Sequence, residues 1–214
     1  MPRAADHVDV RELIPAEPDI DMLRDISQGC TGCDLYKGGT QTVFGEGDVP
    51  ADLMLVGEQP GDQEDKQGHP FVGPAGRLLH EALGEAGLLE GSKYITNVVK
   101  HFKWMARGKR RIHKKPNLSE IRACRPWLES EIDVVRPQAI VCLGATAAQA
   151  LLGPQFRVTK HRGELVESPL APLIMATIHP SAILRADEGD RDAERAAFVA
   201  DLSGVARALE SARS

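Results

Sequence analysis

The sequence lacks long apolar runs and is poor in cysteine, and each absence excludes a class of protein. No run reaches the roughly 18 apolar residues of a membrane span, so we expect no membrane partner. Residues 1–22 are acidic and lack the apolar core of a secretory signal, which favours a cytoplasmic protein of bacterial type. Hydrophobic residues make up 42% of the 214 and charged residues 27%, which excludes a mainly disordered chain, a collagen or a disulfide-stapled toxin.

The four cysteines are Cys30, Cys33, Cys124 and Cys142. Without a secretory signal they favour a metal or cluster over disulfides. Cys30 and Cys33 form a Cys-x-x-Cys pair with Gly32 between them, which lets two thiolates reach one metal from a tight turn. Four thiolates suit zinc or a four-iron cluster, and the spacing does not choose between them. The alternatives are a redox pair at Cys30 and Cys33, and buried apolar roles for Cys124 and Cys142.

Positive charge is concentrated in one segment. The formal net charge is −5, yet residues 100–115 hold eight Lys or Arg and no acid, which leaves −13 on the rest of the chain. Phe102, Trp104 and His113 lie within this basic run. Because electrostatic contacts with nucleic acids are local, the run indicates a nucleic-acid partner more strongly than the total charge opposes one. The alternative is a solvated flexible loop.

Hydrophobic patterning predicts an α/β protein. Near-continuous apolar runs, typical of strands covered on both faces, occupy four segments: 52–57, 93–99, 139–144 and 173–178. Helical spacing is found in four others: 75–86, 118–135 with Ser119 as a candidate N-cap, 145–152 and 191–212. The alternation predicts a three-layer α/β/α sandwich with a central four-stranded parallel sheet. We expect residues 21–214 to form this one domain and residues 1–20 to be a loose tail.

Polar residues follow the predicted strands where the strands end. The first strand leads into Glu58, Gln59 and Asp62, the second reaches Asn97, and the fourth leads into His179. Sites in parallel α/β sheets form outside the carboxyl ends of the strands. We therefore expect these five side chains to converge on one rim, which the basic run also leaves.

Five motifs in this order resemble those of a known enzyme superfamily. They are Gly-Glu-Gln-Pro-Gly at 57–61, Gly-His-Pro-Phe-Val-Gly-Pro-Ala-Gly at 68–76, Thr-Asn-Val-Val-Lys-His-Phe-Lys at 96–103, Lys-Arg-Arg-Ile-His at 109–113 and His-Pro-Ser at 179–181. Together with the cysteine order, they resemble the uracil-DNA glycosylase superfamily, specifically its iron–sulfur family four and the UdgX-like branch. The resemblance covers about residues 26–210. His69 departs from the apolar residue often found there, and no motif precedes Asp19.

The resemblance implies a pocket that holds an extruded uracil. Phe71 would stack on the base, Asn97 would read its edge, and the backbone near Gln59 and Asp62 would complete the pocket. His179 would hydrogen-bond a uracil carbonyl as negative charge develops on the leaving base. Outside this context, Phe71 would be read as core packing, Asn97 as a turn cap and His179 as a structural histidine.

The resemblance also implies an unusual role for His113. In UdgX-like proteins the loop histidine attacks the sugar C1′ and stays bonded to the abasic DNA, and Glu58 is placed to accept its proton or to orient water. The DNA contacts would come from the basic run and from the loop after His179, at Lys100, Lys109, Arg110, Arg111 and Ser181. The alternative role for His113 is that of one more cation in a DNA-binding loop.

These inferences predict a uracil-DNA glycosylase that couples covalently to its product through His113. The alternatives are a turnover family-four glycosylase that uses water, and a non-catalytic module that binds uracil-containing DNA. The expected cofactor is a structural [4Fe–4S] cluster on Cys30, Cys33, Cys124 and Cys142, with zinc as the less favoured alternative. The expected partner is uracil-containing DNA, single-stranded and also double-stranded. We expect a cytoplasmic monomer that joins the nucleoid when acting.

Overall fold

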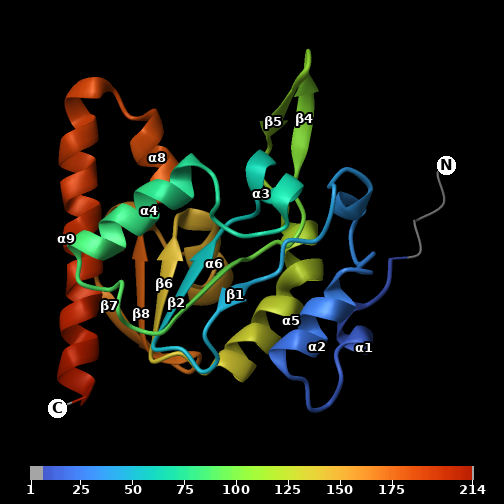
Figure 1. Ribbon diagram of the computed structural model, residues 1–214, viewed down its shortest axis with the longest axis horizontal. Coiled ribbons are helices and arrows are strands. Elements are labelled where there is room, and N and C mark those ends of the chain that lie inside the picture. The colour runs from blue at the N-terminus through green and yellow to red at the C-terminus, as the bar shows by residue number, and fades with distance from the viewer. Residues whose placement is uncertain (1–6, 214) are drawn as a thin grey trace.

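The computed structural model describes residues 7–213, which are built around one mixed six-stranded sheet (Figure 1). Its strand order is β1-β3-β2-β6-β8-β7. The strand bounds are β1 Glu46–Gly47, β2 Leu53–Gly57, β3 Lys93–Asn97, β6 Ala139–Leu143, β7 Leu165–Ser168 and β8 Ala171–Thr177. The four central strands are parallel, as predicted, whereas β1 and β7 pair antiparallel at the two edges. The prediction of a four-stranded sheet was therefore short by two edge strands.

Alternating side chains of the central strands face two helical layers, which gives the predicted three-layer sandwich. On β2, Leu53 and Leu55 pack with one set of helices, and Met54 and Val56 pack with the other. The first layer contains α4 (Pro74–Glu85), α8 (Pro180–Arg185) and α9 (Glu188–Arg213). The second contains α1 (Val10–Leu13), α2 (Ile20–Ser27), α5 (Leu118–Val135), α6 (Ala145–Leu152) and α7 (Val158–His161). In Figure 1, α4 and α9 lie to the left, and α5, α2 and α1 lie to the right.

Residues near the N-terminus are packed, contrary to the loose tail expected over 1–20. Asp9 caps α1 by accepting a hydrogen bond from the backbone N–H of Arg11, and α1 packs against α5. Val10 is buried, and Leu13 packs at the edge of the same core. The apolar face of this short helix is therefore part of the domain. The first six residues of the expected tail lie outside the described part of the chain.

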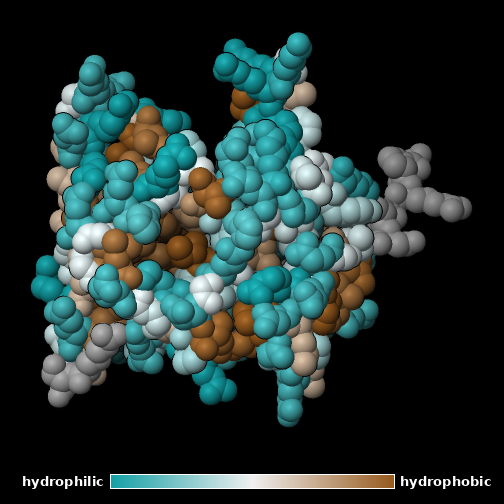
Figure 2. Space-filling view, in the orientation of Figure 1, coloured by the Kyte–Doolittle hydropathy of each residue, from teal (hydrophilic) through white to brown (hydrophobic). Residues whose placement is uncertain are grey.

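The basic run forms a β-hairpin and not a flexible loop. Strand β4 (Trp104–Arg107) pairs antiparallel with β5 (Arg110–His113), and Gly108 makes the turn at a left-handed φ of 60°. Figure 1 shows the hairpin projecting beyond the sheet, next to α3 (Asp62–Gln67). Figure 2 shows it as a hydrophilic projection separated by a notch from α8 and the start of α9.

Local sequence signals fix the element that follows the hairpin. Asn117, and not the predicted Ser119, is the N-cap of α5: its side chain accepts from the Glu120 N–H, and the Glu120 side chain accepts from the Asn117 N–H.

A short 3-10 helix, Asp34–Lys37, follows the Cys-x-x-Cys pair. None of the helices formed by residues 7–213 combines the length and apolarity that crossing a bilayer requires.

Candidate active site

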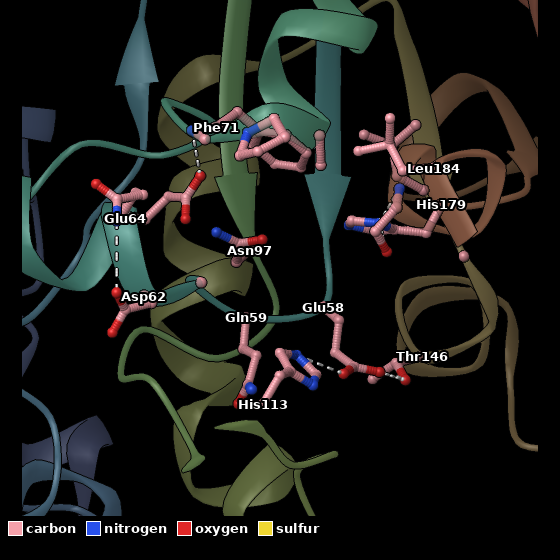
Figure 3. Close-up of a pocket in the computed structure, with 18 of the residues that line it drawn as sticks. Glu58, Gln59, Asp62, Glu64, Phe71, Asn97, His113, Thr146, His179 and Leu184 are labelled. Carbon is pink, nitrogen blue, oxygen red and sulfur yellow. Dashed lines mark hydrogen bonds and ion pairs between the residues drawn. The ribbon is translucent and has the colours of Figure 1, made fainter. Parts of the chain in front are cut away.

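The carboxyl ends of the central strands surround a cavity of about 820 Å³. The five residues expected to converge there, Glu58, Gln59, Asp62, Asn97 and His179, all line it. Phe71, His113 and Ser181 line the same cavity. Figure 3 shows that the labelled side chains among them come from the loop after β2, the start of α3, the segment before α4, the end of β3, the hairpin and the N-cap of α8. The topological expectation of one shared rim is therefore met.

The inner end of the cavity combines an aromatic ring with a buried amide. Asn97, the last residue of β3, is 2% exposed. Phe71 has a left-handed φ of 55°, an uncommon conformation for an aromatic residue, and its ring stacks on that of His179 with 6.0 Å between centroids. A Cβ at Gly57 would lie 2.3 Å from Asn97 Oδ1 and 2.7 Å from Phe71 Cζ. Glycine is therefore required for these two side chains to share the site.

His179 is held as a neutral imidazole of one tautomer. Its Nδ1 accepts a hydrogen bond from the backbone N–H of Ser181 at 3.1 Å, which also caps α8. Burial, followed by the Arg185 charge and the neighbouring His113, lowers the pKa of His179 to about 4. Because Nδ1 is an acceptor, the ring proton sits on Nε2. The side chain can therefore donate one hydrogen bond to a carbonyl oxygen without carrying charge.

His113, Glu58 and Thr146 form a polar chain at the mouth of the cavity (Figure 3). His113 Nε2 lies 3.4 Å from Glu58 Oε1, and the Thr146 hydroxyl donates to Glu58 Oε2. Burial lowers the pKa of His113, although the Glu58 carboxylate opposes that shift. The neutral imidazole is thus favoured, with a carboxylate in reach of its N–H. Thr146 had no sequence signal of its own.

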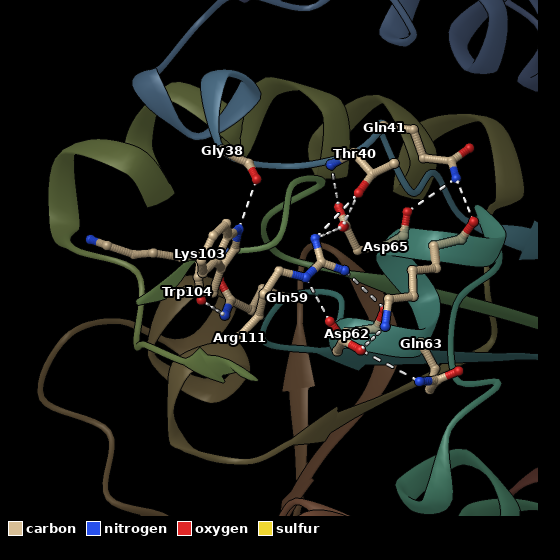
Figure 4. Close-up of polar contacts among 11 residues, drawn as sticks. Gly38, Thr40, Gln41, Gln59, Asp62, Gln63, Asp65, Lys103, Trp104 and Arg111 are labelled. Carbon is tan, nitrogen blue, oxygen red and sulfur yellow. Dashed lines mark hydrogen bonds and ion pairs between the residues drawn. The ribbon is translucent and has the colours of Figure 1, made fainter. Parts of the chain in front are cut away.

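Arg111 docks the hairpin onto the body of the protein (Figure 4). Its Nε donates to Asp62 Oδ1 at 2.7 Å and its Nη1 donates to Asp65 Oδ2 at 2.6 Å. The guanidinium also lies over the rings of Phe102 and Trp104, at 5.4 and 5.6 Å from their centroids. Arg111 is therefore engaged within the protein, and its phosphate contact stays a prediction.

The side chains of Gln59 and Asp62 also support the hairpin, and the substrate contacts expected from the backbone near them stay a prediction. The Gln59 side chain accepts from the Lys103 N–H at 3.1 Å and donates to the carbonyls of Lys103 and Lys114, which lie at the two ends of the hairpin. Hydrogen bonds from Lys66 and then Arg111 lower the pKa of Asp62. Both side chains line the cavity, yet their polar atoms hold the segment that carries His113.

Comparison with known proteins agrees with this geometry. Residues 44–203 match the model of the uracil DNA glycosylase superfamily. The type-4 uracil-DNA glycosylase of Pyrobaculum aerophilum is 35% identical over 86% of this chain and 92% of its own length. That of Thermotoga maritima is 39% identical over 73% of this chain and 78% of its own. A type-5 uracil-DNA glycosylase of Pyrobaculum aerophilum is 33% identical over 64% of each chain.

The chain belongs to the uracil-DNA glycosylase superfamily. The relatives from Pyrobaculum aerophilum and Thermotoga maritima that match most of this chain carry the type-4 name, which agrees with the family-four resemblance of the motifs.

Lys100 lies in the interior of the protein, although the sequence predicts that it contacts DNA. It is 1% exposed, forms an ion pair with the fully buried Glu131, and donates to the Asn97 carbonyl at 2.7 Å and to Thr96 Oγ1 at 2.6 Å. Glu131 also accepts from the Tyr94 hydroxyl. The predicted DNA contact of Lys100 was therefore wrong. Of the other predicted DNA contacts, Lys109 and Arg110 are exposed at the hairpin tip and Ser181 lies in the first turn of α8.

Three of the four cysteines of this glycosylase-superfamily chain lie together. Cys30 and Cys33 add to the elevation of the Cys124 thiol pKa, which burial raises to about 12. Trp127 Nε1–H donates to Cys30 Sγ at 3.4 Å, and the Lys100 backbone N–H donates to Cys124 Sγ at 3.2 Å. Hydrogen bonds of this kind stabilise thiolates bound to a cluster. These three residues fit a cluster as donors.

Cys142 does not join them, which corrects the prediction of four cysteine ligands. It lies within β6, opposite Val56 and Ala176, and burial alone raises its thiol pKa to about 12. No group of three or more His, Cys, Asp or Glu side chains among residues 7–213 is arranged to hold a metal as it stands. The buried His101 follows Lys100, and burial lowers its pKa to about 4. Thr42 contacts His101 Nε2 at 3.1 Å and donates to the Ser27 carbonyl, which also accepts from Cys30.

Proposed function

We propose that this protein excises uracil from DNA and remains bonded to the abasic sugar through His113, as a member of the UdgX-like branch. The observation that carries the proposal is His113 held 3.4 Å from Glu58 at the mouth of the cavity that contains Asn97, Phe71 and His179. A glycosylase acts on a base taken out of the stack, and this cavity offers what such a base needs.

Each inner residue has a chemical task in base recognition and departure. The Asn97 amide supplies one donor and one acceptor, which complements the uracil edge. The Phe71 ring stacks on the base. The neutral His179 donates its Nε2–H to a uracil carbonyl, where it stabilises the negative charge that develops as the glycosidic bond breaks.

His113 then supplies the nucleophile. The lone pair of one imidazole nitrogen forms a bond to C1′, and the electron pair of the C1′–N1 bond leaves with uracil. The imidazolium that results loses the proton of its other nitrogen to the Glu58 carboxylate. Electrons and protons balance, and the product is a neutral imidazole joined to the abasic sugar. The lowered pKa of His113 keeps its lone pair available at neutral pH.

The outer face of the hairpin is suited to the DNA strand that carries the uracil. Met105 and Ile112 are directly paired on this face and are 55% and 37% exposed. Arg107 and Arg110 are paired further toward the tip on the same face. Apolar side chains next to arginines can contact bases and phosphates at once, while the acidic remainder of the protein limits binding to this region. We expect uracil in single-stranded DNA to be the substrate to test first.

A [4Fe–4S] cluster is the proposed cofactor. Cys30, Cys33 and Cys124 would supply three thiolates, and His101 is our candidate for the fourth ligand because it is buried, neutral and next to the Lys100 amide that contacts Cys124. Such a cluster would supply a structural link between α5, the segment before β1 and the end of β3. We assign it no step in the reaction.

The deciding experiment mixes the protein with a single-stranded oligonucleotide that contains one uracil and separates the products on a denaturing gel. We expect a band of the summed mass, and we expect His113→Ala to abolish it. Free abasic product without a shifted band would instead support a turnover glycosylase that uses water. Retention of uracil in the strand would support a non-catalytic binding module. The same uracil-containing oligonucleotide in a duplex and a single strand with thymine in place of uracil are the matched substrates for comparison.

A further inference from the structure

The two oxygens of the Glu58 carboxylate have different partners. Oε1 faces His113 Nε2, and Oε2 accepts the hydrogen bond donated by the Thr146 hydroxyl. Figure 3 shows the three side chains in line, with the carboxylate in the middle. The Glu58 side chain is 20% exposed and Thr146 is 5% exposed, so the hydroxyl binds the carboxylate from the protein side and leaves the other oxygen toward the cavity.

The fold fixes the position of Thr146. It is the second residue of α6, directly after the turn at Gly144, which has a left-handed φ of 93°. The Gly144 N–H donates to the Thr177 carbonyl at 2.8 Å, and a Cβ at Gly144 would lie 3.1 Å from the Cβ of His179. The start of α6 is therefore held against the ends of β6 and β8, and Thr146 is presented at a defined place on the rim.

A fixed donor at this place constrains the Glu58 side chain. A glutamate has three rotatable side-chain bonds, and a hydrogen bond to one oxygen selects the rotamer that aims the other oxygen at His113. The carboxylate is thereby held where it can accept the proton that the imidazole loses.

We propose that Thr146 is a positioning residue for the nucleophile and acts through Glu58. This inference rests on the proposed function, since it concerns the proton acceptor of His113. It completes a Thr146–Glu58–His113 relay in which only His113 touches the reacting carbon.

The test compares Thr146→Val, which keeps the shape and removes the hydroxyl, with Thr146→Ser, which keeps the hydroxyl. Adduct formation and uracil release are measured separately in single-turnover reactions with the uracil-containing single strand. A hydrogen bond to a charged group accounts for roughly a tenfold effect or more, so we expect Thr146→Val to slow adduct formation by about tenfold and Thr146→Ser to stay within about twofold of wild type.

A double-mutant cycle separates positioning from a merely structural role. In a Glu58→Ala background, Thr146→Val should cause no further loss. An additional loss in that background, or a wild-type rate of adduct formation in the single Thr146→Val variant, would overturn the inference. If the wild-type protein releases uracil but forms no adduct, the covalent function fails. The same cycle, read on the rate of uracil release, then still decides whether Thr146 positions Glu58.

Discussion

Replacing Arg111 with methionine should release the hairpin that carries His113. A two-stranded hairpin is marginally stable by itself, so its position depends on what docks it. Arg111 supplies two charge-assisted hydrogen bonds, to Asp62 and to the fully buried Asp65. Methionine keeps the apolar stem against the rings of Phe102 and Trp104 and removes only the charged end.

The size of the effect follows from the burial of Asp65. Removing one partner of a buried ion pair costs about 3–5 kcal/mol, because a charge is left uncompensated. Asp65 keeps two hydrogen bonds, from the Thr40 backbone N–H at 2.8 Å and from its hydroxyl at 2.6 Å, which favours the lower end of this range. A loss of about 3 kcal/mol corresponds to roughly a 150-fold change in the docking equilibrium.

Amide hydrogen exchange measures this equilibrium at a residue that reports on docking. The Lys103 N–H donates to the Gln59 side chain, so its protection requires the docked hairpin. We expect Arg111→Met to reduce that protection about 150-fold and to slow adduct formation in the same samples. Arg110→Met is the matched control for the exchange measurement, because Arg110 is exposed and points to the opposite face of β5. Unchanged protection at Lys103 together with a wild-type adduct rate would refute the assignment of Arg111 as the clamp.

Three further predictions concern the cluster, the buried ion pair and the histidine of the inner pocket. Visible absorbance of the purified protein should survive Cys142→Ala and be lost in Cys124→Ala; loss in both variants would restore Cys142 as a ligand. Lys100→Met should lower the free energy of unfolding by about 3–5 kcal/mol in urea titrations, because Glu131 stays buried without its cation. The matched control Lys109→Met, at the exposed hairpin tip, should change the free energy of unfolding by less than about 0.5 kcal/mol. The pKa of His179 is about 4 in the folded protein and about 6.5 in the unfolded chain, so the unfolded chain binds this proton first as pH falls. The free energy of unfolding should therefore decrease by about 3 kcal/mol between pH 6.5 and pH 4. His179→Gln should flatten that part of the stability profile, and an unchanged slope would contradict the neutral assignment.

The central sheet could be predicted because buried parallel strands are continuous apolar runs, and Leu53–Gly57 and Ala139–Leu143 lie within the predicted segments. The edge strands Glu46–Gly47 and Leu165–Ser168 were missed because they are short and partly exposed, and they carry no comparable apolar run. The convergence of Glu58, Asn97 and His179 followed from topology alone, since the ends of parallel strands meet at one rim.

The roles of individual charges could not be predicted from the basic run. Lys100 and Lys109 look alike in sequence, but Lys100 points inward to Glu131, which lies 31 residues further along the chain on α5. Arg111 likewise meets Asp62 and Asp65, which are remote in sequence and adjacent only in the fold. Cys142 fitted the order of the cysteines, yet the register of β6 places it among apolar residues.

The hairpin contacts the rest of the protein at its two ends and along one face, so it can be moved to another scaffold as a unit. Gln59 holds both ends through backbone atoms, so it constrains the length of the insert and not its side chains. Protein engineers who graft residues 103–114 into a related scaffold would therefore need at least a glutamine at position 59, carboxylates at positions 62 and 65 and the aromatic ring at position 102 to seat it. The turn around Gly108 would then be open to sequence diversification, as a site for tuning which DNA strands are captured.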